Sequence, residues 1–236
     1  RCAFKIGGSD TPLVLKLPKQ RYEEPEIEEY ERSRMDSMTM ERLTKSPYVV
    51  SLYGYCGVSQ VTEYASGGSL YDLIERFRGK QNHPPLRLPP IDKLRIGIQI
   101  ITAVADLHSF ESDGITSVTH NDLDPEQYVF VDGVYKLNDF HYSYFLEKNQ
   151  YTDKVCENPM RIHRRYLKYH APEEGYRDAV DNEKADVYVA GSVMYYVLTS
   201  KWIFEGVNNE KGIRLQRLGK RSPFPLHIKN STDPAD

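Results

Sequence analysis

The sequence predicts an α+β protein in which a small, strand-rich N-terminal part is joined to a larger, mainly helical part. Short apolar segments separated by turn residues dominate positions 1–64, whereas helical periodicity dominates the rest. The chain has 236 residues, of which 39% are hydrophobic. A chain of this size can bury one good core, or two lobes around a cleft.

The N-terminal part begins with two strands joined by a glycine-containing turn, and a helix follows them. Pro25 lies near the expected first turn of this helix, and acidic residues follow it where the positive end of the helix dipole favours them. Two more strands come next, and Gly67-Gly68 ends this part. The expected strands span 2–6, 13–17, 49–55 and 60–64, and the expected helix spans 25–43.

The second part contains two strongly apolar helical segments. From Ile91, apolar residues recur at i, i+3, i+7 and i+10, and Ile100, Val104 and Leu107 form a second face. A helix that is apolar on so much of its circumference is expected in the core, and 185–198 has the same character. Between them lie two short predicted strands, 128–131 and 134–137, and a proline-rich loop at 83–90 precedes the first helix.

Composition and charge give no sign of a nucleic-acid or membrane partner. The net charge of −3 gives no electrostatic reason to expect nucleic acid or a membrane surface as a partner, and no apolar stretch of eighteen residues is present. The three cysteines are scattered, without a C-x-x-C pair, which favours reduced thiols and a cytosolic or nuclear environment, of which we expect the cytoplasm. The first residue is Arg1, so we expect a fragment whose full-length protein can carry an anchor elsewhere.

Two aspartates provide the main chemical signal. Asp122 follows a His-x-Asp turn, and Asp139 opens an Asp-Phe turn seventeen positions later; each lies at the edge of a short apolar strand. This layout suits phosphoryl transfer, in which one carboxylate accepts the proton of the attacking hydroxyl and another holds Mg²⁺ against the phosphates.

With these residues in place, the chain resembles a eukaryotic protein kinase domain of the tyrosine-kinase-like or receptor-like type, over essentially its whole length. The matching segments follow the family's order: Leu13 to Lys16 (V-A-I-K), Val61 to Leu70 (hinge), His120 to Gln127 (catalytic loop), Asp139-Phe140-His141 (D-F-G), Ala171-Pro172-Glu173 (A-P-E) and Asp186-Val187-Tyr188. The resemblance implies a bilobal fold. Its N-lobe, 1–64, is a small antiparallel sheet with one helix, and its C-lobe, 65–236, is mainly helical. It also implies a domain truncated at both ends, since the family's glycine-rich loop precedes Arg1 and its last helices follow Asp236.

The resemblance further implies the roles of individual residues. Asp122 orients and deprotonates the hydroxyl of a protein substrate, while Gln127 and Asp139 hold Mg²⁺ or Mn²⁺. Lys16 holds the phosphates of ATP and pairs with Asp36 of the following helix. The remaining residues implied to bind the nucleotide are Val14, Thr62 (the gatekeeper), Glu63, Ala65 and Val129.

Several positions depart from the family pattern. Gln127 replaces an asparagine, and its extra methylene is awkward for a cation that needs near-octahedral geometry. Asp124 replaces a lysine; two like charges 4 Å apart cost about 4 kcal/mol at an effective dielectric near 20. His141 replaces the D-F-G glycine and is expected to restrict the backbone of that turn. Asn121 replaces an arginine that clamps a phosphorylated loop, so activation by phosphate on the loop is not expected.

Three functions remain open at this stage. The first is an ATP-dependent protein kinase, for which Pro125-Glu126 favours serine and threonine over tyrosine. The second is a pseudokinase that binds nucleotide or acts as a scaffold. The third is a small-molecule phosphotransferase, against which Ala171-Pro172-Glu173 and the segment 142–170 argue, because such enzymes lack a peptide-docking segment.

Overall fold

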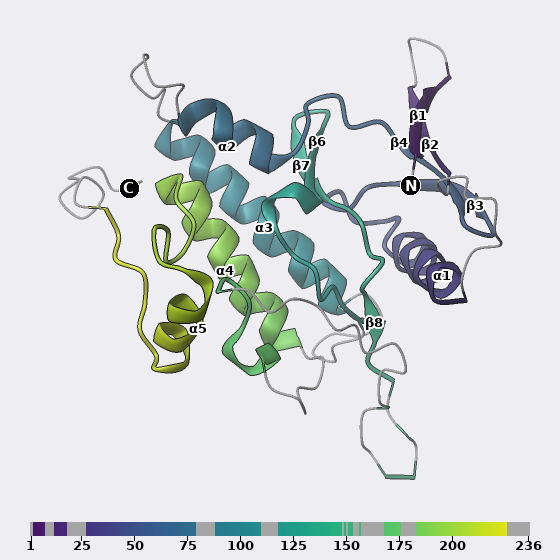
Figure 1. Cartoon of the computed structure of the whole chain (residues 1–236). Helices are drawn as coiled ribbons and strands as arrows, with labels where there is room; N and C mark the ends of the chain where they lie inside the picture. The colour runs from purple at the N-terminus through teal and green to yellow at the C-terminus, as the bar shows by residue number, and fades with distance from the viewer. Residues whose placement is uncertain are drawn as a thin grey trace.

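The structure is a computed structural model that describes residues 2–7, 12–17, 27–78, 88–109, 118–147, 149, 151–152, 156, 168–175 and 183–225. The N-terminal part contains a four-stranded antiparallel sheet of order β1-β2-β4-β3, with helix α1 beside it (Figure 1). The strands are β1 (Cys2–Ile6), β2 (Leu13–Leu17), β3 (Leu52–Cys56) and β4 (Ser59–Glu63), and the helix is α1 (Ile27–Arg42). The strands predicted at 2–6 and 13–17 are confirmed. The strand predicted at 49–55 begins later, because Val49 instead forms an isolated bridge with Leu137.

Helix α1 contacts the sheet through polar as well as apolar side chains. Ser33, Asp36, Ser37 and Thr39 are all buried, together with Met35 and Met40. Gln60 of β4 donates from Nε2 to Ser37 Oγ at 2.7 Å and to the Ser33 carbonyl at 3.3 Å. Because hydrogen bonds are directional, these contacts set the rotation of α1 and therefore the direction of Asp36.

The helical part is built on α3 (Pro90–Ser109) and α4 (Glu183–Thr199), which pack along each other, with α2 (Leu70–Arg78) and α5 (Asn209–Arg217) beside them (Figure 1). Lys93 Nζ donates to the Leu198 carbonyl at 3.1 Å, and a methyl group at Gly97 would lie 3.5 Å from Met194. The core runs continuously from α1 through α3 to α4; it includes Met40, Val49, Leu70, Ile100, Leu107, Leu137, Phe140, Val193 and Tyr196.

The burial predicted for one face of α3 is wrong. Ile91, Leu94, Ile98 and Ile101 are 54%, 46%, 62% and 43% exposed, whereas the second face, with Ile100, Val104 and Leu107, is buried. Helix α4 and strand β7 (Val134–Leu137) contact α3. The periodicity identified both apolar stripes, but it contains no information about which stripe a neighbouring element covers.

The hairpin of β6 (Tyr128–Val131) and β7 joins the two parts. On one side, Phe130 exchanges backbone hydrogen bonds with Gly67 and Gly68; on the other, Leu137 does so with Tyr48 and Val50. A Cβ at Gly67 would lie 2.3 Å from Phe130 Cδ1, so this close approach requires glycine.

The shorter elements are β5 (Val118–Thr119), β8 (Tyr144–Phe145) and the 3₁₀ turns η1 (Pro125–Gln127) and η2 (Pro172–Gly175). Among the described residues, no helix is both long enough and apolar enough to cross a bilayer.

Candidate active site

The loop that carries Asp122 is held by a buried carboxylate of helix α4. Asp186, 2% exposed, accepts hydrogen bonds from the backbone N–H of His120 at 2.7 Å and of Asn121 at 3.0 Å. Its Oδ2 also lies 3.0 Å from Nε2 of His108 on α3. The sequence places Asp186 in a segment that resembles the family but assigns it no role. The signal that could have identified its role is a charged residue inside an otherwise apolar helix, since buried charges need partners.

His120 is a packed residue of this loop. It is fully buried, and its ring lies 5.1 Å from that of Phe140. Its Nδ1 accepts from the Asp122 backbone N–H at 3.2 Å, and its Nε2 lies 3.3 Å from the Asn138 carbonyl. Since a carbonyl only accepts, the proton belongs on Nε2 and the ring is neutral. Both nitrogens are engaged with backbone, so Asp122 is the better candidate for the general base.

Asp122, Gln127 and Lys16 are connected through Asn138. Gln127 Nε2 lies 3.5 Å from Asp122 Oδ2, and the Gln127 carbonyl accepts from Asn138 N–H at 2.9 Å. Asn138 Oδ1 in turn accepts from Lys16 Nζ at 3.1 Å, across 122 positions of sequence. Asn138 immediately precedes Asp139. The structure therefore connects Asp122, Gln127 and Lys16, and Asp139 follows their shared partner in the sequence.

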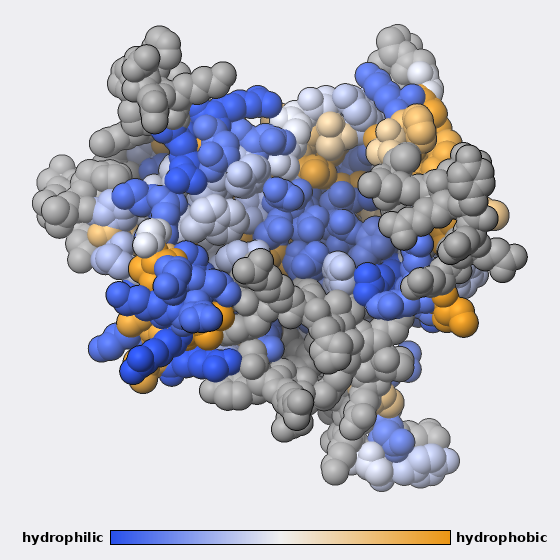
Figure 2. All heavy atoms as spheres, viewed as in Figure 1, coloured by the Kyte–Doolittle hydropathy of each residue, from blue (hydrophilic) through white to orange (hydrophobic). Residues whose placement is uncertain are grey.

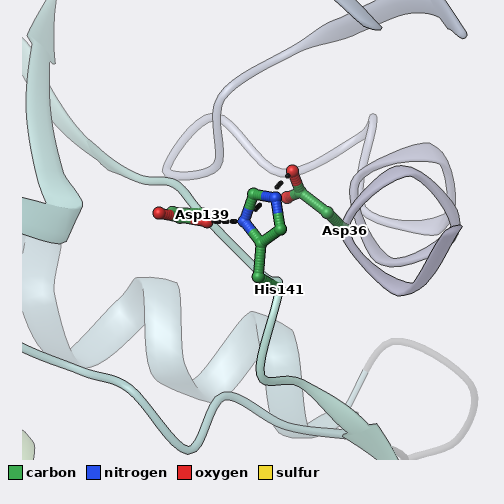
Figure 3. A group of neighbouring side chains, drawn as sticks. All are labelled: Asp36, Asp139 and His141. Atoms are coloured by element: carbon green, nitrogen blue, oxygen red, sulfur yellow. Dashed lines mark hydrogen bonds and ion pairs between the residues drawn. The ribbon is translucent and has the colours of Figure 1, made fainter. Parts of the chain in front are cut away.

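Figure 3 shows Asp36 of α1 with Asp139 and His141 of the Asp-Phe turn. Asp36 is fully buried; its Oδ1 accepts from Phe140 N–H at 2.9 Å, and its Oδ2 lies 3.6 Å from His141 Nδ1. The same Nδ1 hydrogen-bonds Asp139 Oδ1. Asp36 thus links α1 to the Asp-Phe turn, and its pairing with Lys16 stays a prediction.

The backbone of the Asp-Phe turn contains a left-handed residue. The left-handed residue is Asp139, with φ of 64°, and not His141. Aspartate visits this region more readily than most residues do. That His141 restricts the backbone of this turn in place of glycine stays a prediction; the left-handed conformation falls on Asp139.

The residues predicted to hold the nucleotide lie on facing strands and on the connection between the two parts. Val14 and Thr62 are register partners across β2 and β4. The Glu63 carboxylate accepts from Lys136 Nζ of β7 at 2.8 and 2.9 Å, which ties the end of β4 to the hairpin. Ala65 follows Glu63 in the connection, and Val129 lies on β6, bridged to Ser69. Their contact with ATP stays a prediction. In the space-filling view of this face, hydrophilic residues gather beside and below β6 and β7, and hydrophobic ones lie over β1 and β2 (Figure 2).

Asp124 caps the turn η1 and carries a perturbed carboxyl. Its Oδ1 accepts from Glu126 N–H at 2.6 Å and from Gln127 N–H at 3.2 Å, which orients both residues. Burial raises the pKa of Asp124 from 3.8 to about 6; the hydrogen bond from Glu126 opposes this shift, and the charges of Asp122 and Glu126 add to it. The ionised carboxylate of Asp124 is therefore destabilised, although one of its oxygens is needed to accept the two hydrogen bonds that cap the turn.

Asp124→Asn is expected to stabilise the fold at neutral pH. Asparagine keeps the capping oxygen and removes the buried charge. Because the folded-state pKa is raised, folded protein binds this proton more readily than unfolded protein, so wild-type stability falls as pH rises from about 4 to about 6. The difference reaches about 3 kcal/mol at most above pH 6, since one pKa unit corresponds to about 1.4 kcal/mol.

Urea unfolding of both proteins at a series of pH values measures this gap, because the titration of all other groups cancels in the difference. A gap of constant size between pH 4 and pH 7 would contradict the assignment.

Comparison with known proteins supports the resemblance. Residues 9–233 match the family described as the protein kinase domain. The chain is 29% identical over 174 residues to a probable serine/threonine-protein kinase of Dictyostelium discoideum, covering 67% of this chain and 15% of the relative. It is 28% identical over 215 residues to calcium-dependent protein kinase 25 of Arabidopsis thaliana, covering 87% of this chain and 36% of the relative. It is 30% identical over 177 residues to CBL-interacting protein kinase 22 of Oryza sativa subsp. japonica, covering 70% of this chain and 34% of the relative.

The chain belongs to the protein kinase domain family, because the family match covers nearly all of it. The resemblance and the α+β kinase-like fold predicted from the sequence are confirmed. The relatives are named as a probable serine/threonine-protein kinase, a calcium-dependent protein kinase and a CBL-interacting protein kinase. The tyrosine-kinase-like subtype has no counterpart among the three. The chain spans 15% to 36% of the length of these relatives.

Proposed function

We propose that the protein transfers the γ-phosphate of ATP to a serine or threonine hydroxyl of a protein substrate. The observation that carries the proposal is the hydrogen-bonded connection from Asp122 through Gln127 and Asn138 to Lys16. It joins segments from both parts of the chain around groups that suit phosphoryl transfer. The family membership supports the same reaction.

Each residue has a defined task in this proposal. Asp122 accepts the proton of the attacking hydroxyl, which its partly exposed carboxylate can reach. Lys16 neutralises charge on the ATP phosphates and is oriented by Asn138. The tie between Glu63 and Lys136 holds the segment that would position the adenine.

The residues at Asp139 fit a magnesium ion. The Asp139 side chain is 40% exposed, so carboxylate oxygen is accessible, and Gln127 supplies an amide oxygen because its nitrogen faces Asp122. Such hard oxygen ligands are those that Mg²⁺ prefers. When bound with ATP, Mg²⁺ or Mn²⁺ would neutralise charge that develops on the phosphates.

The choice of serine or threonine rests on the relatives and on the loop. One of the three relatives described above is named a probable serine/threonine-protein kinase. In this chain, Pro125-Glu126 favours the same acceptors.

The free thiols Cys56 and Cys156 are exposed, which supports a reducing environment such as the cytoplasm.

Transfer of radioactive phosphate from ATP to a general protein substrate, with Mg²⁺ or Mn²⁺, tests the proposal. We expect phosphoserine and phosphothreonine after acid hydrolysis. Nucleotide binding without phosphate transfer under either metal would contradict the proposal and favour a pseudokinase. Phosphorylation of amino alcohols or sugars in preference to protein would favour a small-molecule phosphotransferase.

A further inference from the structure

The group formed by Asp36, Asp139 and His141 has the composition of a transition-metal site. Each residue offers one ligand atom, and these atoms lie within 4.8 Å of one another. The donors are one imidazole nitrogen and two carboxylate oxygens, contributed by α1 and by the Asp-Phe turn (Figure 3). Mixed imidazole and carboxylate sets suit Zn²⁺ better than Mg²⁺, which prefers oxygen alone.

The contacts within the group point to the same ligand. Two carboxylate oxygens, Asp36 Oδ2 and Asp139 Oδ1, face the single nitrogen His141 Nδ1. One N–H cannot serve both well, whereas a cation bound between them would satisfy all three. Two ligand atoms of a tetrahedral zinc ion lie about 3.4 Å apart when each bond is about 2.1 Å long. The distance between Asp36 Oδ2 and His141 Nδ1 is 3.6 Å. Asp139 Oδ1 and His141 Nδ1 are in direct hydrogen-bond contact and would move apart to bind the ion together.

Burial distinguishes this group from an exposed acidic cluster. Asp36 is fully buried, and its other oxygen is oriented by the backbone N–H of Phe140. A cation bound between the two carboxylates would add to the compensation of this buried charge. The side chains of His141 and Asp139 are 19% and 40% exposed, so an ion can enter from solvent and keep water as a fourth ligand.

We propose that Asp36, Asp139 and His141 bind Zn²⁺, and that the bound ion ties α1 to the Asp-Phe turn. On binding, the lone pair of Nδ1 forms the bond to zinc, and the ring proton resides on Nε2. This site uses Asp139, which also faces the proposed nucleotide metal. Zinc is therefore an inhibitor of phosphate transfer; this consequence rests on the proposed function, whereas the binding site itself does not.

Zinc binding is measured on the full chain without nucleotide, by competition with a chromophoric zinc chelator. We expect wild-type protein to bind one more Zn²⁺ than His141→Ala, or to bind it at least tenfold more tightly. His170→Ala is the matched control, because His170 Nδ1 also lies 3.5 Å from a carboxylate, that of Glu174, but is outside the group of Asp36, Asp139 and His141. Its zinc binding should equal that of wild type. Equal binding by wild type and His141→Ala would overturn the proposal.

Thermal melting completes the test. Zinc should raise the melting temperature of wild type and of His170→Ala, but not that of His141→Ala. If His141→Ala does not fold, Asp36→Asn replaces it, since asparagine keeps an acceptor for Phe140 N–H and weakens the metal ligand. Unchanged zinc binding by Asp36→Asn would equally overturn the site.

Phosphate transfer distinguishes the two proposals. Inhibition by zinc that is relieved in His141→Ala supports the shared use of Asp139. Zinc binding without inhibition of an active enzyme would contradict that shared use. Zinc binding that depends on His141 in a protein without transferase activity would support the metal site and contradict the proposed function.

Discussion

Asp122→Asn should lower kcat for phosphate transfer about a hundredfold or more, as expected for loss of a general base. Asparagine has nearly the same shape and keeps an oxygen facing Gln127 Nε2. It cannot accept the proton of the hydroxyl at neutral pH. Because the proposed role of Asp122 is toward the hydroxyl and not the nucleotide, KM for ATP should change little.

Steady-state kinetics with a serine-containing peptide and varied ATP measure both constants. Asp132→Asn is the matched control: Asp132 is an exposed aspartate at the β6–β7 turn, with φ of 46°, a conformation that asparagine tolerates. Its kinetics should equal those of wild type. A kcat within threefold of wild type for Asp122→Asn would remove Asp122 from its assigned role.

Asp186→Ala is expected to lower both stability and kcat. The substitution leaves the backbone N–H groups of His120 and Asn121 without their acceptor and removes a partner of His108. Buried unsatisfied groups cost about 1–3 kcal/mol each, so we expect a loss of roughly 3 kcal/mol in the free energy of unfolding. Asp122 follows directly on this loop, so kcat should fall even where the variant is folded.

Urea unfolding and kinetics at low temperature separate the two effects. Asp186→Asn should recover part of both losses, because its single oxygen can accept from one N–H. Glu183→Ala serves as the control, since Glu183 is an acidic residue of the same first turn but is only partly buried. An Asp186→Ala protein with wild-type stability and kcat would show that the loop is held by other contacts.

The local elements were predictable because they depend on residues close in sequence. The bounds of β6 and β7 agree with the prediction, since two short apolar runs flank the turn at Asp132-Gly133. The predicted helices agree in position as well. The exposed stripe of α3 was not predictable, because burial depends on which neighbour covers a face.

The contacts that assemble the candidate site were predictable only in part. The motif around Asp122 and Asp139 marks the residues, but the bond between Lys16 and Asn138 joins positions that share no local pattern. The direction of Asp36 toward Phe140 N–H depends on how α1 packs. Sequence therefore identified the chemical groups, and packing decided their partners.

The central claim is that Lys16, Asp122, Gln127 and Asp139 act on one bound nucleotide. A crystal structure of the chain with Mg²⁺ and a non-hydrolysable ATP analogue tests it most directly. We expect Lys16 Nζ within hydrogen-bond distance of a phosphate oxygen, and oxygens of Asp139 and Gln127 on the metal. A nucleotide bound with its phosphates away from Lys16 and Asp139 would contradict the account.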